Sequence, residues 1–321
     1  MNKWTSVEQR VIDYLTFRRS LGYLLKIEGQ ELNRFAKFSK ARKHRGVITV
    51  ELALAWANDT DSSNAYRARR LDVVRGLTKF CSLYEPETEI PGKRLLGPSR
   101  GRSSPYIYTN QEIAALIAQA QQLIPIEGMR PITMGYFLGL LACTGLRVSE
   151  AVHLKNDDVD LDGARLTIRN TKFRKSRYVA LDKSAVEALT EYCVKKRGQI
   201  AAEDVSTFFV IDGGLPLTYR KAAYAFQVIK NKLGWDTIPH RRPRLYDLRH
   251  TFACQRILKW YQEGVDVDWA LPFLSTYLGH VKVSDTYWYL TGIPELMSVV
   301  SKRFEHYAET KEVEHENIDI R

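Results

Sequence analysis

The sequence has few cysteines, no long apolar run and no phosphate-binding GxxxxGK[ST] motif. Its four cysteines lie far apart without a CxxC pair, which excludes a closely spaced zinc site and favours reduced, buried thiols. No apolar stretch approaches the roughly 20 residues that span a bilayer, and the first residues lack the apolar segment of a secretory signal. We therefore expect a cytoplasmic protein that contacts no membrane. The missing GxxxxGK[ST] motif argues against a bound nucleotide.

Charge is plentiful and unevenly distributed. The chain carries 48 Lys and Arg against 37 Asp and Glu, a formal net charge of +11. Residues 1–104 hold 20 basic against 11 acidic side chains, whereas residues 105–321 hold 28 against 26. The last 17 residues contain six acids and two bases, so the end of the chain is acidic. This distribution fits a polyanionic partner, although a solvated basic surface has the same composition.

With 321 residues and 45% hydrophobic side chains, two folded domains are the natural expectation. Residues 5–84 show helical patterns throughout, starting with a capping box at Thr5-x-x-Glu8. A second helix is predicted near 27–41, a third after Thr49 and a fourth after Ser62 and Ser63. One side of the fourth helix is cationic and either contacts DNA phosphates or is simply solvated; this side includes Arg67, Arg70 and Lys79.

The periodic pattern stops from about 85 to 107, where prolines, glycines and basic residues gather as in an interdomain linker. A capping box at Thr109-x-x-Glu112 then opens a new helix, and an apolar helix over 132–143 ends at Thr144-Gly145. Alternating residues within 159–181 predict a small antiparallel sheet with a basic hairpin. The later predicted elements are helices at 184–198 and 218–233 with a short strand between them, and helices within 246–304 broken at Gly264, Gly279 and Gly292.

Four separated segments carry the residues needed to cleave a phosphodiester, namely cations, an acid and a nucleophile. They are TGLRVSE (144–150), NTKFRKSRYVAL (170–181), RLYDLRHTFA (244–253) and LGHVKVSDTYWYL (278–290). In this order they resemble the catalytic signature of the tyrosine recombinase, or phage integrase, family. The stretch TYWYLTGIPELM is also similar to the transposon-associated branch, so we identify the chain as a Xer- or transposon-type recombinase.

The resemblance implies a mainly α fold, in which a helical N-terminal core-binding domain precedes a mixed α+β catalytic domain with a small antiparallel sheet. The implied boundaries are 1–90 for the core-binding domain, 91–107 for a basic linker, 108–304 for the catalytic domain and 305–321 for an acidic tail. The implied activity is site-specific DNA recombination through a 3′-phosphotyrosyl intermediate. It needs no metal or other cofactor. The implied partners are double-stranded DNA and three further copies in a synaptic tetramer, or related recombinases, at the nucleoid.

The resemblance also assigns roles to individual residues. The implied catalytic set is Arg147, Lys172, Tyr246, Arg249, His280 and Tyr289, supported by Glu150 and His250. Arg147 and Arg249 offer forked donors to one phosphate, although an ion pair with Glu150 or Asp157 is the alternative for Arg147. Further contacts to DNA phosphates are expected from Arg67, Arg70, Lys79, Arg174, Lys175 and Arg177.

Lys172 is the candidate acid for the leaving 5′-oxygen, but Arg174 and Lys175 are close rivals, because a short slip in a hairpin exchanges the side chains that point inward. Tyr289 is the candidate nucleophile because it follows His280 by nine residues. Tyr287 competes with it, yet two helical positions differ by roughly 200°, so one of the two faces the phosphate. Nearby cationic charges are expected to favour the Tyr289 phenolate.

One position departs from the family pattern, since Tyr246 stands where a histidine usually precedes the arginine by three residues. A phenol donates a hydrogen bond but does not shuttle protons near neutral pH, which leaves Lys172 and His280 with the acid–base work. Three other functions remain open: a DNA-binding protein without strand transfer, a type IB-like topoisomerase, and a metal nuclease that uses a group of aspartates. Those aspartates are Asp157, Asp158, Asp160 and Asp162.

Overall fold

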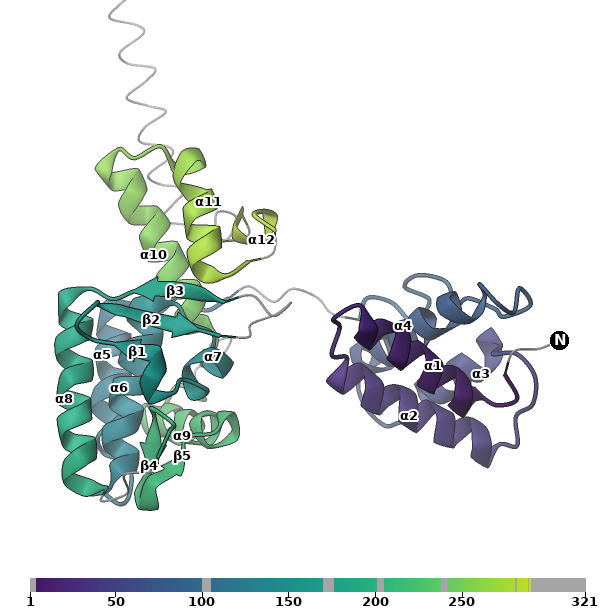
Figure 1. Ribbon diagram of the computed structural model, residues 1–321, viewed down its shortest axis with the longest axis horizontal. Helices are drawn as coiled ribbons and strands as arrows, with labels where there is room; N and C mark the ends of the chain where they lie inside the picture. The colour runs from purple at the N-terminus through teal and green to yellow at the C-terminus, as the bar shows by residue number, and fades with distance from the viewer. Residues whose placement is uncertain are drawn as a thin grey trace, which may run out of the picture. The chain divides into compact units, whose positions relative to one another are not determined.

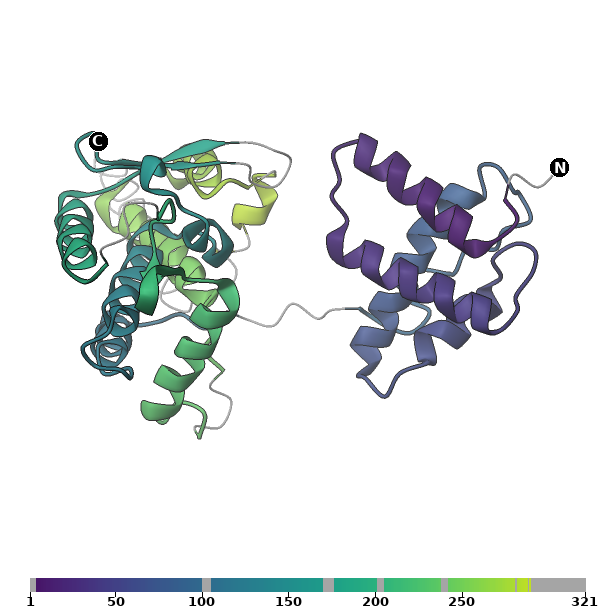
Figure 2. The ribbon, with the colours of Figure 1, turned by 60° about the horizontal axis from the view of Figure 1, so that its bottom comes forward.

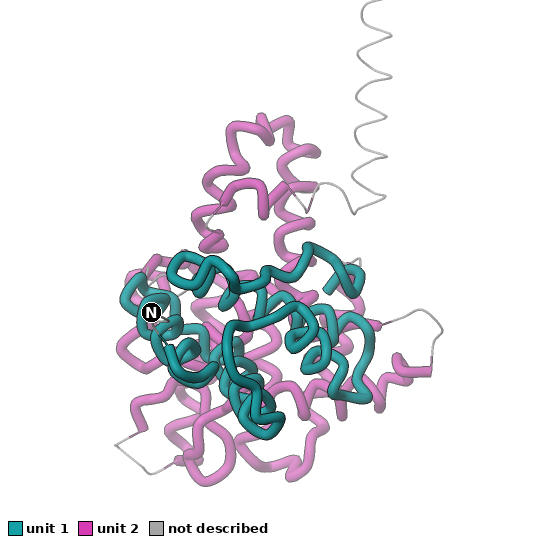
Figure 3. Tube along the Cα trace, turned by 90° about the vertical axis from the view of Figure 1, so that its right-hand side faces the viewer, with its two compact units in different colours: residues 1–103 teal, residues 104–321 magenta. Residues whose placement is uncertain are grey.

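The computed structural model describes residues 4–99, 105–169, 176–200, 205–237, 242–280, 282–287 and 289. The chain divides into two compact units, residues 1–103 and 104–321, which are coloured separately in Figure 3. Each unit has its own buried apolar core. The mainly α class predicted from the sequence, with small antiparallel sheets confined to the second part, is confirmed.

Unit 1 is built from helices α1 (Val7–Ser20), α2 (Lys26–Ala41), α3 (Val50–Asn58) and α4 (Asn64–Cys81). Helices α1 and α2 lie side by side and both pack on α4 (Figure 2). The predicted caps at Thr49 and Ser63 are the N-cap positions of α3 and α4. The predicted cap at Thr5 is wrong by one residue, because the Ser6 hydroxyl accepts the Gln9 backbone N–H of α1 at 3.2 Å.

The stretch after α4 is part of the fold of unit 1. Glu85 accepts two hydrogen bonds from Arg10 at 2.7 and 2.8 Å, and both side chains are at most 2% exposed. Glu89 accepts the first backbone N–H of α3, and Leu96 packs against the core. Proline and glycine therefore mark irregular backbone over residues 85–99 rather than a detached connector. Residues 100–104 lie outside the described residues.

In unit 2 (Figure 1) the capping box of Thr109 and Glu112 is present as predicted. The apolar helix ends at Gly145, whose φ of +62° suits glycine and closes the helix. The helices are α5 (Asn110–Ala120), α6 (Met129–Thr144), α7 (Val148–Val152), α8 (Lys183–Gln199), α9 (Tyr219–Lys232), α10 (Asp247–Glu263), α11 (Val267–Leu278) and α12 (Ser284–Tyr287). In the described part of the chain, no helix is both long and apolar enough to cross a membrane.

The predicted sheet forms from β1 (Val159–Asp160), β2 (Arg165–Ile168) and β3 (Arg177–Ala180) in antiparallel order β1-β2-β3. Leu166 opposes Val179, and both are buried, so this face of the sheet covers the core. A second antiparallel pair joins β4 (Val210–Ile211) to β5 (Leu215–Pro216). Helix α6 runs through the centre and packs against α5, α8 and α10. Helix α11 lies against β3, which brings the last predicted motif to the hairpin segment (Figure 1).

Candidate active site

Three arginines from three separate segments meet at the C-terminal end of α11. Arg177 of β3 donates to the Tyr277 carbonyl at 2.7 Å, Arg249 of α10 to Leu278 at 2.7 Å, and Arg147 at the start of α7 to Gly279 at 2.9 Å. The last carbonyls of a helix have no partners within the helix and carry partial negative charge. Successive carbonyls therefore hold the three guanidinium groups. Those of Arg147 and Arg249 belong to the predicted catalytic set, and that of Arg177 to the predicted DNA contacts.

Glu150 is the carboxylate that serves this cluster. Arg147 donates to it from Nη1 at 2.7 Å and from its backbone N–H at 3.0 Å, and Arg177 donates from Nη1 and Nη2 at 3.0 and 2.8 Å. Burial raises the pKa of Glu150, but the hydrogen bonds and charges of Arg177 and Arg147 outweigh burial and lower it to about 2. The ion pair with Glu150, given as the alternative for Arg147, is present and orients its guanidinium.

Arg177 was predicted to contact DNA, but the structure gives it another position. Its side chain is 11% exposed, and all three guanidinium nitrogens are bonded to Glu150 or Tyr277. The basic hairpin suggested a phosphate contact because charge does not reveal which way a strand residue points. In the β2–β3 register Arg177 pairs with the buried Ile168, so it lies on the same face of the sheet as the buried pair of Leu166 and Val179.

Arg249 is buried at 1% exposure, donates from Nη1 to the Gly145 carbonyl at 2.8 Å, and keeps a buried Nε without a hydrogen-bond partner. Burial lowers its pKa, and the neighbouring charge of Arg147 lowers it further. Arg147, Arg177 and Arg249 carry three positive charges against the one negative charge of Glu150. This leaves a surplus of two positive charges in a largely buried place, which an anion would compensate.

The ring nitrogens of His280 are both engaged. Arg249 donates to Nε2 at 2.9 Å, and Nδ1 lies 2.8 Å from the hydroxyl of Thr286. Since a guanidinium can only donate, Nε2 is the acceptor and Nδ1 carries the proton of a neutral ring. Burial lowers the pKa of His280 to about 4, assisted by the charges of Arg249 and Arg147. The imidazole is therefore neutral near pH 7.

Tyr289 lies in the same place and is 3% exposed. Its ring stacks on His280 at 5.9 Å between centroids, and meets the ring of His250 edge-on at 5.3 Å. Burial raises the pKa of Tyr289, and the opposing charge of Arg249 does not compensate. The charge of Arg249 does favour the phenolate, as expected, but the expected net effect is wrong for the protein without DNA, because desolvation outweighs that charge. Tyr287 is 44% exposed on α12 and lies in neither ring contact.

Tyr246 is 43% exposed at the N-cap of α10, and its ring meets His250 at 5.1 Å. His250 thus contacts the rings of both Tyr246 and Tyr289. Its place directly after Arg249 in the sequence suggested a supporting role but did not predict this contact with the candidate nucleophile. Lys172, Arg174 and Lys175 lie outside the described residues.

In unit 1 the residues predicted to bind DNA differ in their positions on α4. Arg70 is buried, donates to the Asp59 carbonyl at 2.8 Å and packs over the Trp56 ring, so it supports the fold instead of facing solvent. Amphipathic spacing did not predict this position, because the Arg70 guanidinium lies over the ring of Trp56 on a different helix. Lys79 is exposed and Arg67 is half-buried.

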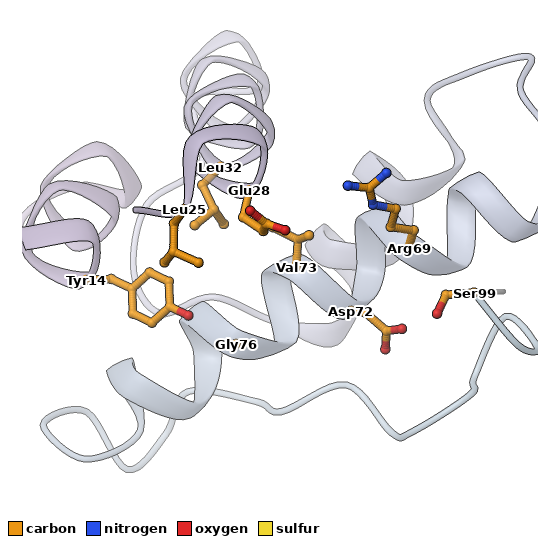
Figure 4. A pocket seen from close by; sticks show the side chains of 9 residues that line it. All are labelled: Tyr14, Leu25, Glu28, Leu32, Arg69, Asp72, Val73, Gly76 and Ser99. Carbon is orange, nitrogen blue, oxygen red and sulfur yellow. The ribbon is translucent and has the colours of Figure 1, made fainter. Parts of the chain in front are cut away.

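Unit 1 also has a hollow of about 380 Å³ bordered by α1, α2 and α4 (Figure 4). Arg69 lines it together with Glu28 and Asp72, so acids outnumber bases. The hydroxyl of Tyr14 lies against Gly76, so that a Cβ atom at Gly76 would be 3.0 Å from the Tyr14 hydroxyl oxygen. This charge balance does not suit a phosphate.

Two of the four aspartates of the metal-nuclease hypothesis have basic partners of their own. Asp158 accepts from Arg169 at 2.5 Å and caps the Lys155 backbone N–H, and Asp160 pairs with Arg165 at 2.9 Å. Across the residues that the structure describes, no group of three or more His, Cys, Asp or Glu side chains could hold a metal ion. These acids therefore stabilise the edge of the sheet.

Residues 107–292 match the family described as Phage integrase family, which covers the site residues above. The y4rB protein of Sinorhizobium fredii, whose name classes it with integrases and recombinases, is 38% identical over 94% of this chain and 98% of its own length. The chain belongs to the phage integrase family. Its members include tyrosine recombinases, and the tyrosine recombinase XerC of Chlamydia trachomatis is 28% identical over 74% of this chain and 70% of its own.

The fold of this family member agrees with a solved structure of the integrase of the transposon Tn1549 in complex with a circular intermediate DNA. The two structures superpose with a TM-score of 0.66 over 94% of this chain and 100% of that one, at 13% identity. Family membership places the chain among enzymes of site-specific recombination. The sequence-based recognition is confirmed.

Proposed function

We propose that the protein cuts and rejoins DNA by site-specific recombination, with Tyr289 as the nucleophile. The observation that carries the proposal is the buried cluster of Arg147, Arg177 and Arg249, which has two unbalanced positive charges beside a buried tyrosine. A phosphodiester supplies one negative charge and two non-bridging oxygens. The forked donors of Arg147 and Arg249 suit those oxygens, while Arg177 holds Glu150 in place.

The proposed reaction has a cleavage step and a rejoining step. The Tyr289 hydroxyl gives its proton to a base as its oxygen attacks the phosphorus; the O–P bond forms, and the bond to the 5′-oxygen breaks. The leaving oxygen takes a proton from Lys172, and the Tyr246 hydroxyl donates a hydrogen bond to the phosphate. His280, held neutral between Arg249 and Thr286, packs against the nucleophile. A 5′-hydroxyl from another strand then attacks the phosphotyrosine and reseals the backbone, so no cofactor is required.

The working form is a tetramer of this chain, or of this chain with related recombinases, on two DNA sites at the nucleoid. Residues 1–90 clamp the duplex as a core-binding domain together with residues 91–99, since Leu96 packs on the same core. The catalytic domain covers residues 108–304, and residues 305–321 form an acidic tail. Phosphate contacts come from Arg67, Lys79, Arg174 and Lys175. The likeness to the Tn1549 integrase supports movement of a mobile element as the biological role.

Covalent trapping tests the proposal. The protein is incubated, with EDTA present, with nicked duplexes from the ends of the element that encodes it, so that the short cleaved strand diffuses away. We expect a denaturant-resistant adduct with the wild type and with the Tyr287→Phe control, and none with Tyr289→Phe, which keeps its ring between the two histidines. Specific DNA binding without an adduct would instead support a DNA-binding protein that lost strand transfer at Tyr246.

A sulfur substitution identifies the acid. If Lys172 protonates the leaving oxygen, Lys172→Ala slows adduct formation by about 100-fold or more. Replacing the bridging 5′-oxygen by sulfur, which leaves without a proton, restores the rate. The same substitution at Arg174 or Lys175 is expected to weaken binding, with equal effects on the oxygen and sulfur substrates. Recovery with sulfur in one of those two variants would move the role from Lys172 to that residue.

A further inference from the structure

His250 occupies a position that the reaction described above does not use. It lies on the first turn of α10, directly after Arg249. Its ring meets the ring of Tyr246 at 5.1 Å and 74°, and the ring of Tyr289 at 5.3 Å and 62°. The imidazole therefore lies in contact with both Tyr289, the proposed nucleophile, and Tyr246, which replaces the usual histidine of the family.

One ring nitrogen of His250 is chemically idle. Nδ1 is buried and has no hydrogen-bond partner among the described atoms. A buried polar atom without a partner costs free energy, and such atoms in native proteins are often functional. Burial lowers the pKa of His250, the Arg244 and Arg249 charges lower it further, and Asp247 opposes them. The ring is therefore neutral near pH 7 and has a lone pair available.

The other basic groups around Tyr289 are already occupied. His280 accepts from Arg249 at one nitrogen and has its other nitrogen against Thr286. Glu150 is saturated by Arg147 and Arg177. Tyr246 is a phenol and no better a base than Tyr289 itself. Yet burial raises the pKa of Tyr289, so its proton must leave as the bond to phosphorus forms.

We propose that His250 accepts the phenolic proton of Tyr289 during strand cleavage and returns it during rejoining. This inference rests on the proposed recombinase function. In the forward step the Tyr289 O–H bond breaks, an N–H bond forms on His250, the O–P bond forms, and the bond to the 5′-oxygen breaks with protonation from a separate acid. The hydrogen bond forms as Tyr289 turns from its packed position toward the phosphate. Tyr246 packs against the imidazole and fixes its orientation, as a positioning residue.

The first test compares His250→Gln with the wild type on the nicked duplexes used for trapping. His153→Gln is the matched control, because His153 is exposed and its Nδ1 contacts only the Ser149 carbonyl of its own helix. We expect His250→Gln to bind DNA normally in a gel-shift assay but to form adduct about 100-fold more slowly or worse. The rise in rate with pH that reflects His250 deprotonation should also disappear.

Chemical rescue separates proton transfer from packing. In His250→Ala, added imidazole should restore adduct formation in a saturable manner, whereas pyrrole, which has the same planar five-membered ring and no basic nitrogen, should not. With 5′-thio substrates the defect of His250→Gln should persist, since the missing group acts on the nucleophile and not on the leaving atom.

Two results would overturn the inference and are distinguishable. If the wild type forms adduct and His250→Gln forms it at the same rate with the same pH profile, the recombinase proposal stands and the role of His250 fails. If neither wild type nor variant forms adduct on DNA that both bind specifically, the recombinase proposal fails and the inference with it.

Discussion

The two units use buried arginines in different ways. In unit 1, Arg10 is matched one to one by Glu85, and Arg70 covers the ring of Trp56. In unit 2, Arg147 and Arg177 share the carboxylate of Glu150, Arg249 has no carboxylate partner among the described residues, and all three arginines donate to carbonyls at the end of α11. An arginine paired with one carboxylate is electrically neutralised within the fold, whereas a cluster with more arginines than carboxylates can bind an anion. The number of carboxylates available to the buried arginines therefore distinguishes the structural arginines of unit 1 from the candidate anion-binding arginines of unit 2.

The largest expected effect is on Arg249. Because a forked donor in a buried site stabilises developing charge, Arg249→Lys should slow adduct formation by about 10²–10³-fold. Arg70→Lys is the matched change in unit 1 and should lower thermal stability while leaving the adduct rate of the folded protein unchanged. The two rates are measured on the same nicked duplex at saturating protein. Equal losses of rate in both variants would remove the distinction between the two units.

A second comparison concerns the two carboxylates. Glu85→Gln leaves Arg10 buried without its counter-ion and should lower the free energy of unfolding by about 3–5 kcal/mol. Glu150→Gln should also destabilise the protein, but added sulfate should recover part of that loss, because an anion can bind the uncompensated arginines of unit 2. Denaturant titrations with and without sulfate measure both. Recovery of Glu85→Gln by sulfate to the same extent would show that the anion acts nonspecifically.

The pH dependence of Glu150 sharpens this contrast. Its pKa in the folded protein is about 2, below the ordinary 4.5. The stability it contributes is therefore complete above pH 4.5 and is lost as the pH falls toward 2. Wild type should lose more stability than Glu150→Gln across this interval, and parallel curves would mean that the ion pairs do not bias the protonation of Glu150.

A smaller effect is expected at Gly279, where the chain turns at the end of α11 with φ of +69°. A Cβ atom there would lie 2.9 Å from Arg177 Nη1, so Gly279→Ala combines backbone strain of roughly 1–2 kcal/mol with displacement of the guanidinium. Gly213→Ala is the matched control, because φ is +70° and no atom lies within 4 Å of the added carbon. Both variants should be destabilised in thermal melts, but only Gly279→Ala should also lose adduct formation. Equal activity in the two would show that the position of Arg177 is not critical.

The order of elements in both units follows from periodicity and capping residues, because these are local signals. The gathering of Arg147, Arg249, His280 and Tyr289 in one place was implied by the resemblance of four motifs to the family. The inward turn of Arg177 and the burial of Arg70 could not be predicted from the sequence, since each depends on packing against residues far away in the chain. The contact of His250 with Tyr289 likewise depends on the tertiary structure, and helical periodicity does not predict it.

The smallest effect is expected from His280. It tests whether the positive charges of Arg249 and Arg147 lower the pKa of this neighbouring side chain. Its pKa in the folded protein is about 4, against an ordinary value of 6.5. The unfolded chain therefore binds more protons between these values, so stability is complete above pH 6.5 and declines as the pH falls toward 4. His280→Gln should flatten this decline in denaturant titrations. Because a bound phosphate offsets the charges of Arg249 and Arg147, specific DNA should raise the pKa of His280, which NMR titration of its ring can follow. A pKa that stays near 4 on DNA would mean that the phosphate does not lie beside these arginines.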